Sequence, residues 1–428
     1  MRQRKFKAPQ RKTARRWRVP PALTLGGGDV FEGLSILDDV PGELGLVLWQ
    51  SLRDCMLWGR VSETERGALF AADAEPARVA AILAAAVPAE IEEPLKTIAG
   101  ILGGGAREES VALACRRIMQ WADEGGLLAV ALAFAQAAAV VTPGDPAAAY
   151  AVGRLARRRA EHARSETWYR RTVALARQVG DWPTYALAFV GLGNLYAQRG
   201  AYPAARRFHT RALRAAGRNS LHAIEGQALH ELFGIAVETG RAQEAEELAR
   251  AAFEAYGPHH PQLPSFAHDV AYWWTTQGHF TRSLRVLQEI LPHLSTPVVR
   301  VLVLADIARA AGGAGEVEAF RQAWDETRVL LRGREMEEAA ARALLDLAHG
   351  ALSLKAWEQA EEAARQALEV ATQRRESKIR LSAEAVLDAA RRHAVVATEP
   401  APALKPETVQ AADELATDFV HSLQTAGA

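Results

Sequence analysis

The amino-acid sequence predicts an all-α solenoid of about seven helix pairs. Hydrophobic residues make up 49% of the 428 residues and charged residues 24%, and the long segments rich in Ala, Leu, Arg and Glu favour helices. Runs that alternate β-branched or aromatic residues with polar ones, as half-buried strands require, are nearly missing from the sequence. A segment at 188–213 also has counterparts about 40 residues before and after it, and such a period is typical of stacked helix pairs.

The repeating unit places small residues where two helices must touch. In the central copy these residues are Gly193 and Ala205, and larger side chains surround them. The pattern therefore predicts that each pair buries its apolar face only against its neighbours. The residues that carry it are Leu192, Gly193, Tyr196, Tyr202, Ala205 and Phe208, with Gly153, Leu155, Trp168 and Tyr169 before them and Gly240, Ala245, Leu248 and Ala252 after them.

Residues 1–28 are predicted to be a disordered basic arm. Its first 18 residues hold nine cations and no acid, whereas the whole chain has a formal net charge of zero. Such an arm can bind the phosphates of a nucleic acid, an acidic protein or an anionic membrane surface, or it can serve only as a solubilising tail. The cations are Arg2, Arg4, Lys5, Lys7, Arg11, Lys12, Arg15, Arg16 and Arg18.

Residues 29–105 are expected to form a small helical N-terminal unit outside the repeats. Pro41 suits the first turn of a helix, and Leu44, Leu48 and Leu52 follow it at helical spacing. An enzyme hidden in this segment is an alternative reading. The segment is short and poor in paired polar residues, which argues against that alternative.

The repeats are predicted over residues 109–373. One small residue marks the second helix of each pair, and the marks lie 34 to 40 residues apart, apart from one gap of about two periods. That gap predicts a degenerate repeat near residues 318–331. A capping helix at 374–395 should follow, and then a linker with a short final helix at 396–428, which could stand detached. The marks are Ala131, Ser165, Ala205, Ala245, Ser283 and Ala360.

Segment 187–213 resembles a tetratricopeptide repeat. Gly193, Tyr196, Gly200, Ala205 and Ala212 stand at the family's small, aromatic and turn positions, and residues 344–368 match next best. The period of 38 to 40 is longer than the common 34 and resembles longer variants found in bacterial regulators. The resemblance implies a right-handed superhelical solenoid whose first helices line a concave groove for a peptide or a partner helix.

Carrying the family's groove positions over by phase gives a candidate binding site. An Asn flanked by arginines can hold a carboxylate or a peptide backbone, because Arg offers forked donors and Asn offers both a donor and an acceptor. The alternative is a solvated polar face. Trp273 is a candidate recognition residue, whereas Trp274 is expected in the core. The groove residues are Arg154, Arg157, Arg158, Asn194, Gln198, His230, Glu231, His268, Asp269, Tyr272, Arg342, Asp346 and His349.

No pattern in the sequence indicates catalysis, a cofactor or a metal. The glycine clusters at 26–28 and 103–105 lack the Lys-Ser/Thr of a phosphate-binding loop. His259, His260 and His268 lack the spacing of a zinc site, and loop or surface histidines are the preferred reading. We therefore expect a protein that is not an enzyme and has neither a cofactor nor a metal ion.

Cellular location is expected to be cytoplasmic. Cys55 and Cys115 sit in apolar helical patterns, which favours small core residues in a reducing compartment. The longest apolar stretch, at 127–141, is too short to span a bilayer. Arg15 and Arg16 resemble a twin-arginine signal, but no apolar core or cleavage site follows them.

These patterns together predict a protein–protein interaction scaffold or regulator that captures a peptide or helix in its groove. The alternative is a nucleic-acid-associated regulator that uses the basic arm. The sequence names no partner.

Overall fold

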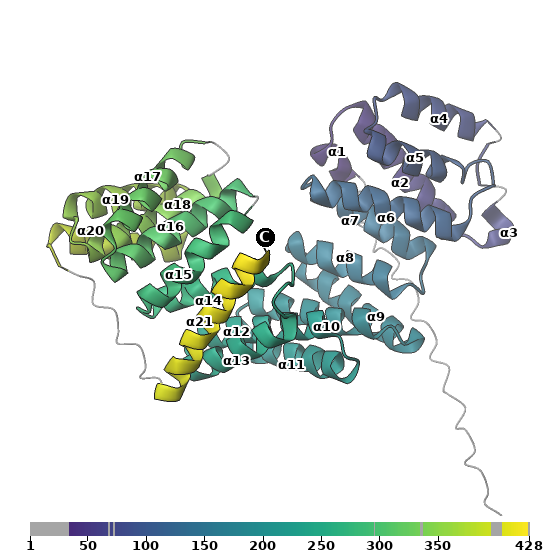
Figure 1. Ribbon diagram of the computed structural model, residues 1–428. Coiled ribbons are helices and arrows are strands. Elements are labelled where there is room, and N and C mark those ends of the chain that lie inside the picture. Colours follow the sequence, from purple (N-terminus) through teal and green to yellow (C-terminus); the bar gives the residue numbers. More distant parts are fainter. Residues whose placement is uncertain are drawn as a thin grey trace, which may run out of the picture. The chain divides into compact units, whose positions relative to one another are not determined.

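Helices form every regular element among the residues that the computed structural model describes, which are 34–66, 69–71, 73–294, 296–333, 337–394 and 405–426. The prediction of an all-α chain is therefore confirmed over these residues (Figure 1). The chain divides into two compact units, Met1–Asn219 (unit 1) and Ser220–Ala428 (unit 2).

Unit 1 begins with five helices and continues with three helix pairs. The first five helices are not a separate body, because α1 and α2 pack on α7, and α5 packs on α6. Ile36, Leu48 and Ile91 share one hydrophobic core with Ile118 and Phe134 of the first pair. The helices are α1 (Ser35–Asp39), α2 (Glu43–Trp58), α3 (Glu63–Arg66), α4 (Ala74–Ala84), α5 (Ala89–Ala99), α6 (Glu108–Glu124), α7 (Leu128–Val141), α8 (Pro146–Arg158), α9 (His162–Val179), α10 (Trp182–Gln198) and α11 (Tyr202–Arg218).

Local sequence explains where these helices begin and end. The Asp145 carboxylate accepts a hydrogen bond from the Ala147 amide and Pro146 follows in the first turn, so α8 has both a cap and a preset backbone angle. Asp181 caps α10 in the same way through the Thr184 amide. Gly180 closes α9 at a positive φ of 79°, where glycine avoids the strain of a side chain.

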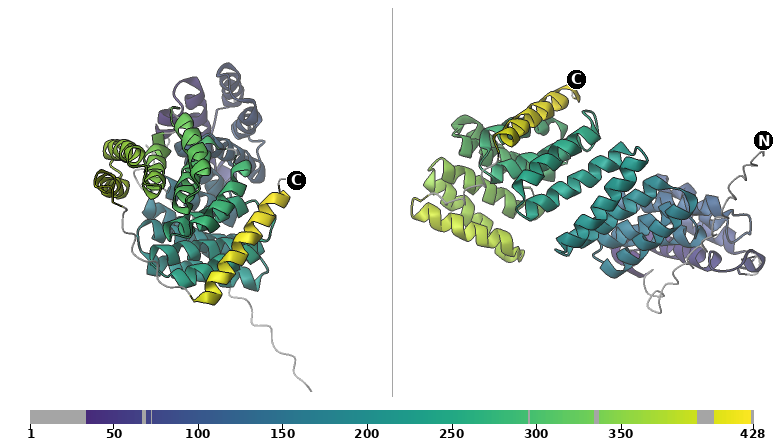
Figure 2. Two further views of the ribbon diagram at one scale, coloured as in Figure 1. Left: turned by 60° about the vertical axis from the view of Figure 1, so that its left-hand side comes forward. Right: turned by 90° about the horizontal axis from the view of Figure 1, so that it is seen from below.

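Unit 2 contains four further helix pairs and two terminal helices (Figure 2). The pairs α6–α7 to α18–α19 number seven within the described residues, as predicted. The elements are α12 (His222–Glu238), α13 (Ala242–Tyr256), α14 (Leu263–Thr276), α15 (Phe280–Ile290), a 3₁₀ turn (Leu291–His293), α16 (Pro297–Ala314), α17 (Val317–Leu330), α18 (Glu337–Ser353), α19 (Trp357–Gln373), α20 (Ser377–Arg391) and α21 (Pro406–Ala426).

The repeat expected to be degenerate forms a complete pair, α16 and α17. Phe320 occupies the position at which the other second helices carry a small residue, and it is only 4% exposed. The space comes from the next pair, because a Cβ atom at Gly350 would lie 3.0 Å from the Phe320 ring. A large side chain in one helix is thus offset by a missing side chain in another.

The two terminal helices behave differently. Helix α20 packs on α19 and α18, as a cap should. The sequence allowed the final helix to stand detached, but α21 packs against α13 and α15 in the middle of unit 2. Figure 1 shows α21, in yellow, lying away from the α20 helix that precedes it in the chain.

The predicted helix contact at Gly193 is present in unit 1. Gly193 and Ala205 are both buried, and a Cβ atom at position 193 would collide with the His209 ring of α11. His209 is fully buried, and burial lowers its pKa to about 4, so the ring is neutral at pH 7. The absence of a side chain at Gly193 therefore leaves room for the His209 ring to pack against α10 in the core.

A close approach of two first helices in unit 2 also depends on glycine. A Cβ atom at Gly312 of α16 would collide with the backbone of Gly350 in α18, and one at Gly350 would collide with the backbone of Ala308. Backbone atoms have no alternative rotamer, so these two positions set the spacing between α16 and α18.

The two cysteines, which are 60 residues apart in sequence, meet in the core of unit 1. The Cys55 and Cys115 sulfurs lie 3.7 Å apart as free thiols. The hydrogen bond with Cys115 and burial raise the pKa of the Cys55 thiol well above its usual range. Both side chains are core residues, as the sequence predicted, and Cys55 is a poor thiolate.

The glycine contact predicts opposite effects for two Gly→Ala substitutions in unit 2. Gly312→Ala should lower the free energy of unfolding by about 1–3 kcal/mol, because the methyl group forces α16 away from α18. Gly234→Ala in α12 is the matched control, since a Cβ atom there meets nothing within 4 Å. It should stabilise by up to about 1 kcal/mol through helix propensity. Urea unfolding followed by circular dichroism measures both, and an unchanged midpoint for Gly312→Ala would contradict the spacing argument.

Candidate functional site

Five charged side chains meet where α14, α16 and α18 pack side by side, on what we call the first-helix face of unit 2. They are His268, Asp306, Arg309, Arg342 and Asp346, here called the charged cluster. The His268 Nε2 atom lies 2.7 Å from Asp306 Oδ2, and Arg309 Nη1 donates to Asp346 Oδ1 at 2.7 Å. Arg342 bridges the two carboxylates, with Nη2 3.5 Å from Asp306 and Nε 3.7 Å from Asp346.

The carboxylates lie beneath the arginines. The side chains of Asp306 and Asp346 are 0% and 2% exposed, whereas those of Arg309 and Arg342 are 18% and 34% exposed. A buried carboxylate needs a cation and further hydrogen bonds to offset its lost hydration. Three buried atoms of the charged cluster nevertheless have no hydrogen-bond partner within the described residues: Asp306 Oδ1, Asp346 Oδ2 and Arg342 Nε. The cluster can therefore form more hydrogen bonds than it makes within the chain.

The pKa shifts follow from this arrangement. Burial lowers the pKa of His268, but the hydrogen bond to Asp306 and the charges of Asp306 and Asp269 outweigh it, so the pKa is raised above its usual value. Burial raises the pKa of Asp346, although Arg309 opposes the shift. At the edge of the cluster, burial and the charge of Arg309 lower the pKa of His349 to about 4. Compared with a free imidazole, His268 is therefore easier to protonate and His349 is harder to protonate.

Residues around the cluster extend the polar surface. The Arg342 guanidinium lies over the Tyr272 ring, 4.3 Å from its centroid, in cation–π geometry. The His230 Nε2 atom lies 2.8 Å from Asp269 Oδ2 and so joins α12 to α14. The structure therefore brings together the predicted site residues of two helices, with His230 of α12 beside them. These residues are His268, Asp269 and Tyr272 of α14 and Arg342, Asp346 and His349 of α18. The other predicted residue of α12, Glu231, is half-buried.

Sequence reasoning missed Asp306 and Arg309. Both lie in α16, which belongs to the repeat interpreted as degenerate, so no groove position was assigned to that helix. A signal was present, because these two charges stand three residues apart in the otherwise apolar segment 301–311. Charges at that spacing lie on one helix face.

Trp273 is a core residue and does not form a recognition surface. It is 4% exposed and meets Phe233 edge-to-face, with ring centroids 5.6 Å apart. Phe233, which stands at the small position of its repeat, is buried as well. Trp274 is fully buried, as expected, and its indole N–H donates to Glu246 at 2.9 Å.

The predicted groove residues of unit 1 are arranged differently. Arg154 donates to Asp123 of α6 at 2.6 Å, and Arg158 pairs with the same carboxylate. Asp123 thus neutralises two of the arginines expected to hold a ligand carboxylate. Arg157 and Asn194 are half-buried and Gln198 is exposed.

A family model agrees with the repeat pattern over part of the chain. Residues 145–217 match the family model described as tetratricopeptide repeat. These residues therefore carry the tetratricopeptide repeat pattern. Its chain is similar to the crystal structure of BtubC (BKLC) from P. vanneervenii, with 15% identity and a TM-score of 0.41 over 53% of this chain and 92% of that one. It is also similar to the P58(IPK) TPR domain, with 14% identity and a TM-score of 0.30 over 81% and 79% of the chains. No curated protein matches.

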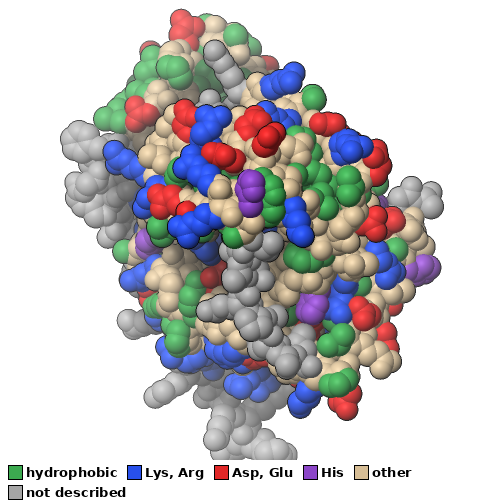
Figure 3. All heavy atoms as spheres, turned by 90° about the vertical axis from the view of Figure 1, so that its left-hand side faces the viewer, with side chains coloured by type: hydrophobic (Ala, Val, Ile, Leu, Met, Phe, Trp, Pro, Cys, Tyr) green, Lys and Arg blue, Asp and Glu red, His purple; other side chains and the backbone are tan. Residues whose placement is uncertain are grey.

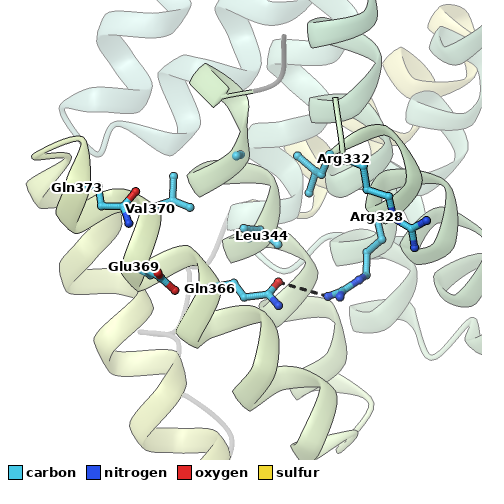
Figure 4. A pocket seen from close by; sticks show the side chains of 9 residues that line it. Arg328, Arg332, Leu344, Gln366, Glu369, Val370 and Gln373 are labelled. Carbon is cyan, nitrogen blue, oxygen red and sulfur yellow. Dashed lines mark hydrogen bonds between the residues drawn. The ribbon is translucent and has the colours of Figure 1, made fainter. Parts of the chain in front are cut away.

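Other features of the protein are weaker site candidates. A cavity of about 410 Å³ lies among α17, α18 and α19, with Leu331, Leu344 and Val370 among its apolar lining residues (Figure 4). Its rim residue Arg328 already donates to Glu362 at 3.0 Å. On the face shown in Figure 3, acidic and basic side chains are intermixed, so no field of one sign marks a site.

Some sequence predictions fall outside this description. The nine cations of the basic arm all lie in residues 1–33, outside the described part of the chain. Among the described residues, no group of three His, Cys, Asp or Glu side chains is arranged to hold a metal ion. The described helices also include none with the length and apolar character of a membrane span.

The charged cluster predicts a specific titration behaviour. In the wild-type chain His268 should titrate above its usual pKa of 6.5, and Asp306→Asn should bring it below 6.5, because burial then dominates. The contribution of the pair to the free energy of unfolding is therefore fully present below pH 6.5 and is lost as the pH rises through the folded pKa. Ring NMR of His268 measures this shift, with His349 as the internal reference; a pKa unmoved by Asp306→Asn would contradict the pairing.

Proposed function

We propose that the protein is an adaptor or regulator that binds a peptide or helix of a partner protein on the first-helix face of unit 2. Tetratricopeptide repeats are interaction scaffolds, and solenoids of this kind present extended binding surfaces. The observation that carries the proposal is the charged cluster, in which three buried polar atoms lack hydrogen-bond partners beneath two partly exposed arginines.

The chemistry of those atoms favours a peptide backbone as the ligand. Asp306 Oδ1 and Asp346 Oδ2 can accept hydrogen bonds, and Arg342 Nε can donate one. A peptide offers N–H donors and C=O acceptors side by side, so it can satisfy both kinds of atom. A simple anion would satisfy Arg342 but would be repelled by the two carboxylates. Tyr272 and Arg342 would provide a flat surface beside the backbone.

Residues of unit 1 are proposed as a further part of the binding surface. Gln198 is exposed there and Arg157 and Asn194 are half-buried, whereas Arg154 and Arg158 would have to share a ligand carboxylate's place with Asp123. We therefore assign the main anchor to unit 2. The protein would act in the cytoplasm, where the free thiols of Cys55 and Cys115 are stable.

Peptide selection followed by substitution tests the proposal. Peptides are selected from a random library on the full-length chain, and their Kd values are measured by fluorescence anisotropy. Arg342→Ala should weaken binding at least about 30-fold, because it removes a largely desolvated charged contact. Arg321→Ala is the matched control, since Arg321 lies exposed on α17 and pairs only with the exposed Glu318 among the described residues. It should leave Kd unchanged.

The thermal unfolding midpoint of each variant shows whether it remains folded. Selected peptides that bind a folded Arg342→Ala variant as tightly as the wild type would contradict the assignment of the site.

The alternative function, a nucleic-acid-associated regulator, rests on the nine cations within residues 1–18 and stays a prediction from the sequence. Gel shifts in rising salt would test it, because phosphate binding weakens steeply with salt.

A further inference from the structure

The C-terminal helix α21 occupies a groove formed by the second helices α13 and α15. It contacts both helices, although its hydrogen-bond partners in the groove lie 127 to 168 residues earlier in the chain. The repeats already end in α20, which packs on α18 and α19. Helix α21 is thus neither a repeat nor the cap, and it contacts the solenoid as a bound helix would (Figures 1 and 2).

One stripe of α21 provides its apolar contact. The buried residues recur at spacings of three, four and seven, which places them on a single face of the helix. Phe419 is the largest of them, and it meets Phe253 of α13 and Phe266 of α14 edge-to-face at 5.2 and 5.7 Å between ring centroids. The buried residues are Thr408, Ala412, Leu415, Ala416, Phe419, Ser422 and Leu423.

Two arginines of the groove recognise carboxylates of α21. The Arg282 Nε atom donates to Asp413 Oδ1 at 2.6 Å, and Arg250 pairs with Asp418. Each arginine also donates to a backbone carbonyl of the helix, Arg282 to Val409 at 3.2 Å and Arg250 to Ala411 at 2.9 Å. The groove therefore fixes both the register and the direction of the helix that it holds.

The groove is charged beneath the helix as well. Arg282 is 8% exposed and lies over the Trp274 ring, 5.2 Å from its centroid. The buried Glu246 lies 3.8 Å from the same guanidinium. Asp413 is thus the second carboxylate facing Arg282, and it stands at the open edge, where its side chain is 61% exposed. A helix leaving the groove would take this carboxylate with it and uncover Arg282.

We infer that this groove is a second binding site, for an amphipathic helix of a partner protein that carries carboxylates five residues apart and a Phe directly after the second. In the free protein, helix α21 occupies this binding site, and the partner helix displaces α21 when it binds. The contacts of α21 define the side chains that a partner helix needs. It needs carboxylates to pair with Arg282 and Arg250, an aromatic ring to pack against Phe253 and Phe266, and small residues elsewhere on the buried face. The site is separate from the charged cluster of the proposed function.

The test uses the full-length chain and a labelled peptide of residues 406–426. In a released variant, Asp413→Ala, Asp418→Ala and Phe419→Ala together remove the contacts of α21, and hydrogen exchange should show that residues 406–426 lose protection. The peptide should then bind the released variant at least about 30-fold more tightly than it binds the wild type, whose groove is occupied. Glu414→Ala is the matched control, because Glu414 is exposed beside Asp413, and it should leave α21 protected.

Substitutions in the groove separate recognition from loss of structure. In the released variant Arg282→Ala should weaken peptide binding at least about 30-fold, whereas Arg285→Ala, on the exposed side of α15, should not change it. A designed helix that shares only the two carboxylates and the Phe should compete with the peptide. The same helix with lysines in place of the carboxylates should not.

A measurement on the wild-type chain does not depend on any variant being folded. An excess of the designed helix should raise hydrogen exchange in residues 406–426. Unchanged protection, or a released variant that leaves the peptide unbound, would overturn the inference. Dimers that exchange α21 and exclude the free peptide would also overturn it, by assigning the groove to a second copy of the chain.

Discussion

The close approach of α16 and α18 through Gly312 and Gly350 is the constraint on which the candidate site depends. Without side chains at these positions, the two backbones touch, and residues up to about two turns away are brought together. Arg309 of α16 then reaches Asp346 of α18, and Arg342 of α18 lies near Asp306 of α16. Two helices held farther apart would separate Asp346 from Arg309 and Asp306 from Arg342, and each buried carboxylate would lose one of its cations, which is unfavourable.

The same constraint explains why the cluster is incomplete within the chain. The glycines fix the helix spacing, so the charged side chains cannot move together to satisfy every polar atom. Arg342 lies between two carboxylates at 3.5 and 3.7 Å, with neither contact in hydrogen-bond geometry. Unsatisfied atoms of this kind lower stability, and they are also where a ligand gains most by supplying the missing bonds. The backbone packing thus creates the site and leaves it open to a partner.

Local and periodic features of the fold could be predicted from the sequence, whereas pairings between distant residues could not. Gly193 and Ala205 fall at helix contacts because small residues recur at a fixed period, and the seven pairs follow from that period. The link from Arg154 and Arg158 to Asp123 depends on how α6 and α8 face each other, which no single-helix pattern records. Asp306 and Arg309 were missed because the large Phe320 stands where the other repeats carry a small residue, so their repeat was interpreted as degenerate and no site residue was assigned to it. The stripe on α21 predicted a helix, but its sequence alone could not show which groove it would occupy.

The two helix layers of unit 2 offer different chemistry, and this difference would allow two partners to be distinguished. The first helices present buried carboxylates under arginines, which suits the alternating donors and acceptors of a backbone. The second helices present arginines beside aromatic rings, which suits the acidic and aromatic side chains of a folded helix. An extended peptide lacks the helical face that α13 and α15 require, and a helix has no free backbone N–H along its length for Asp306 or Asp346. A ligand fitted to one layer is therefore poorly fitted to the other, and specificity follows from the secondary structure of the partner as much as from its sequence.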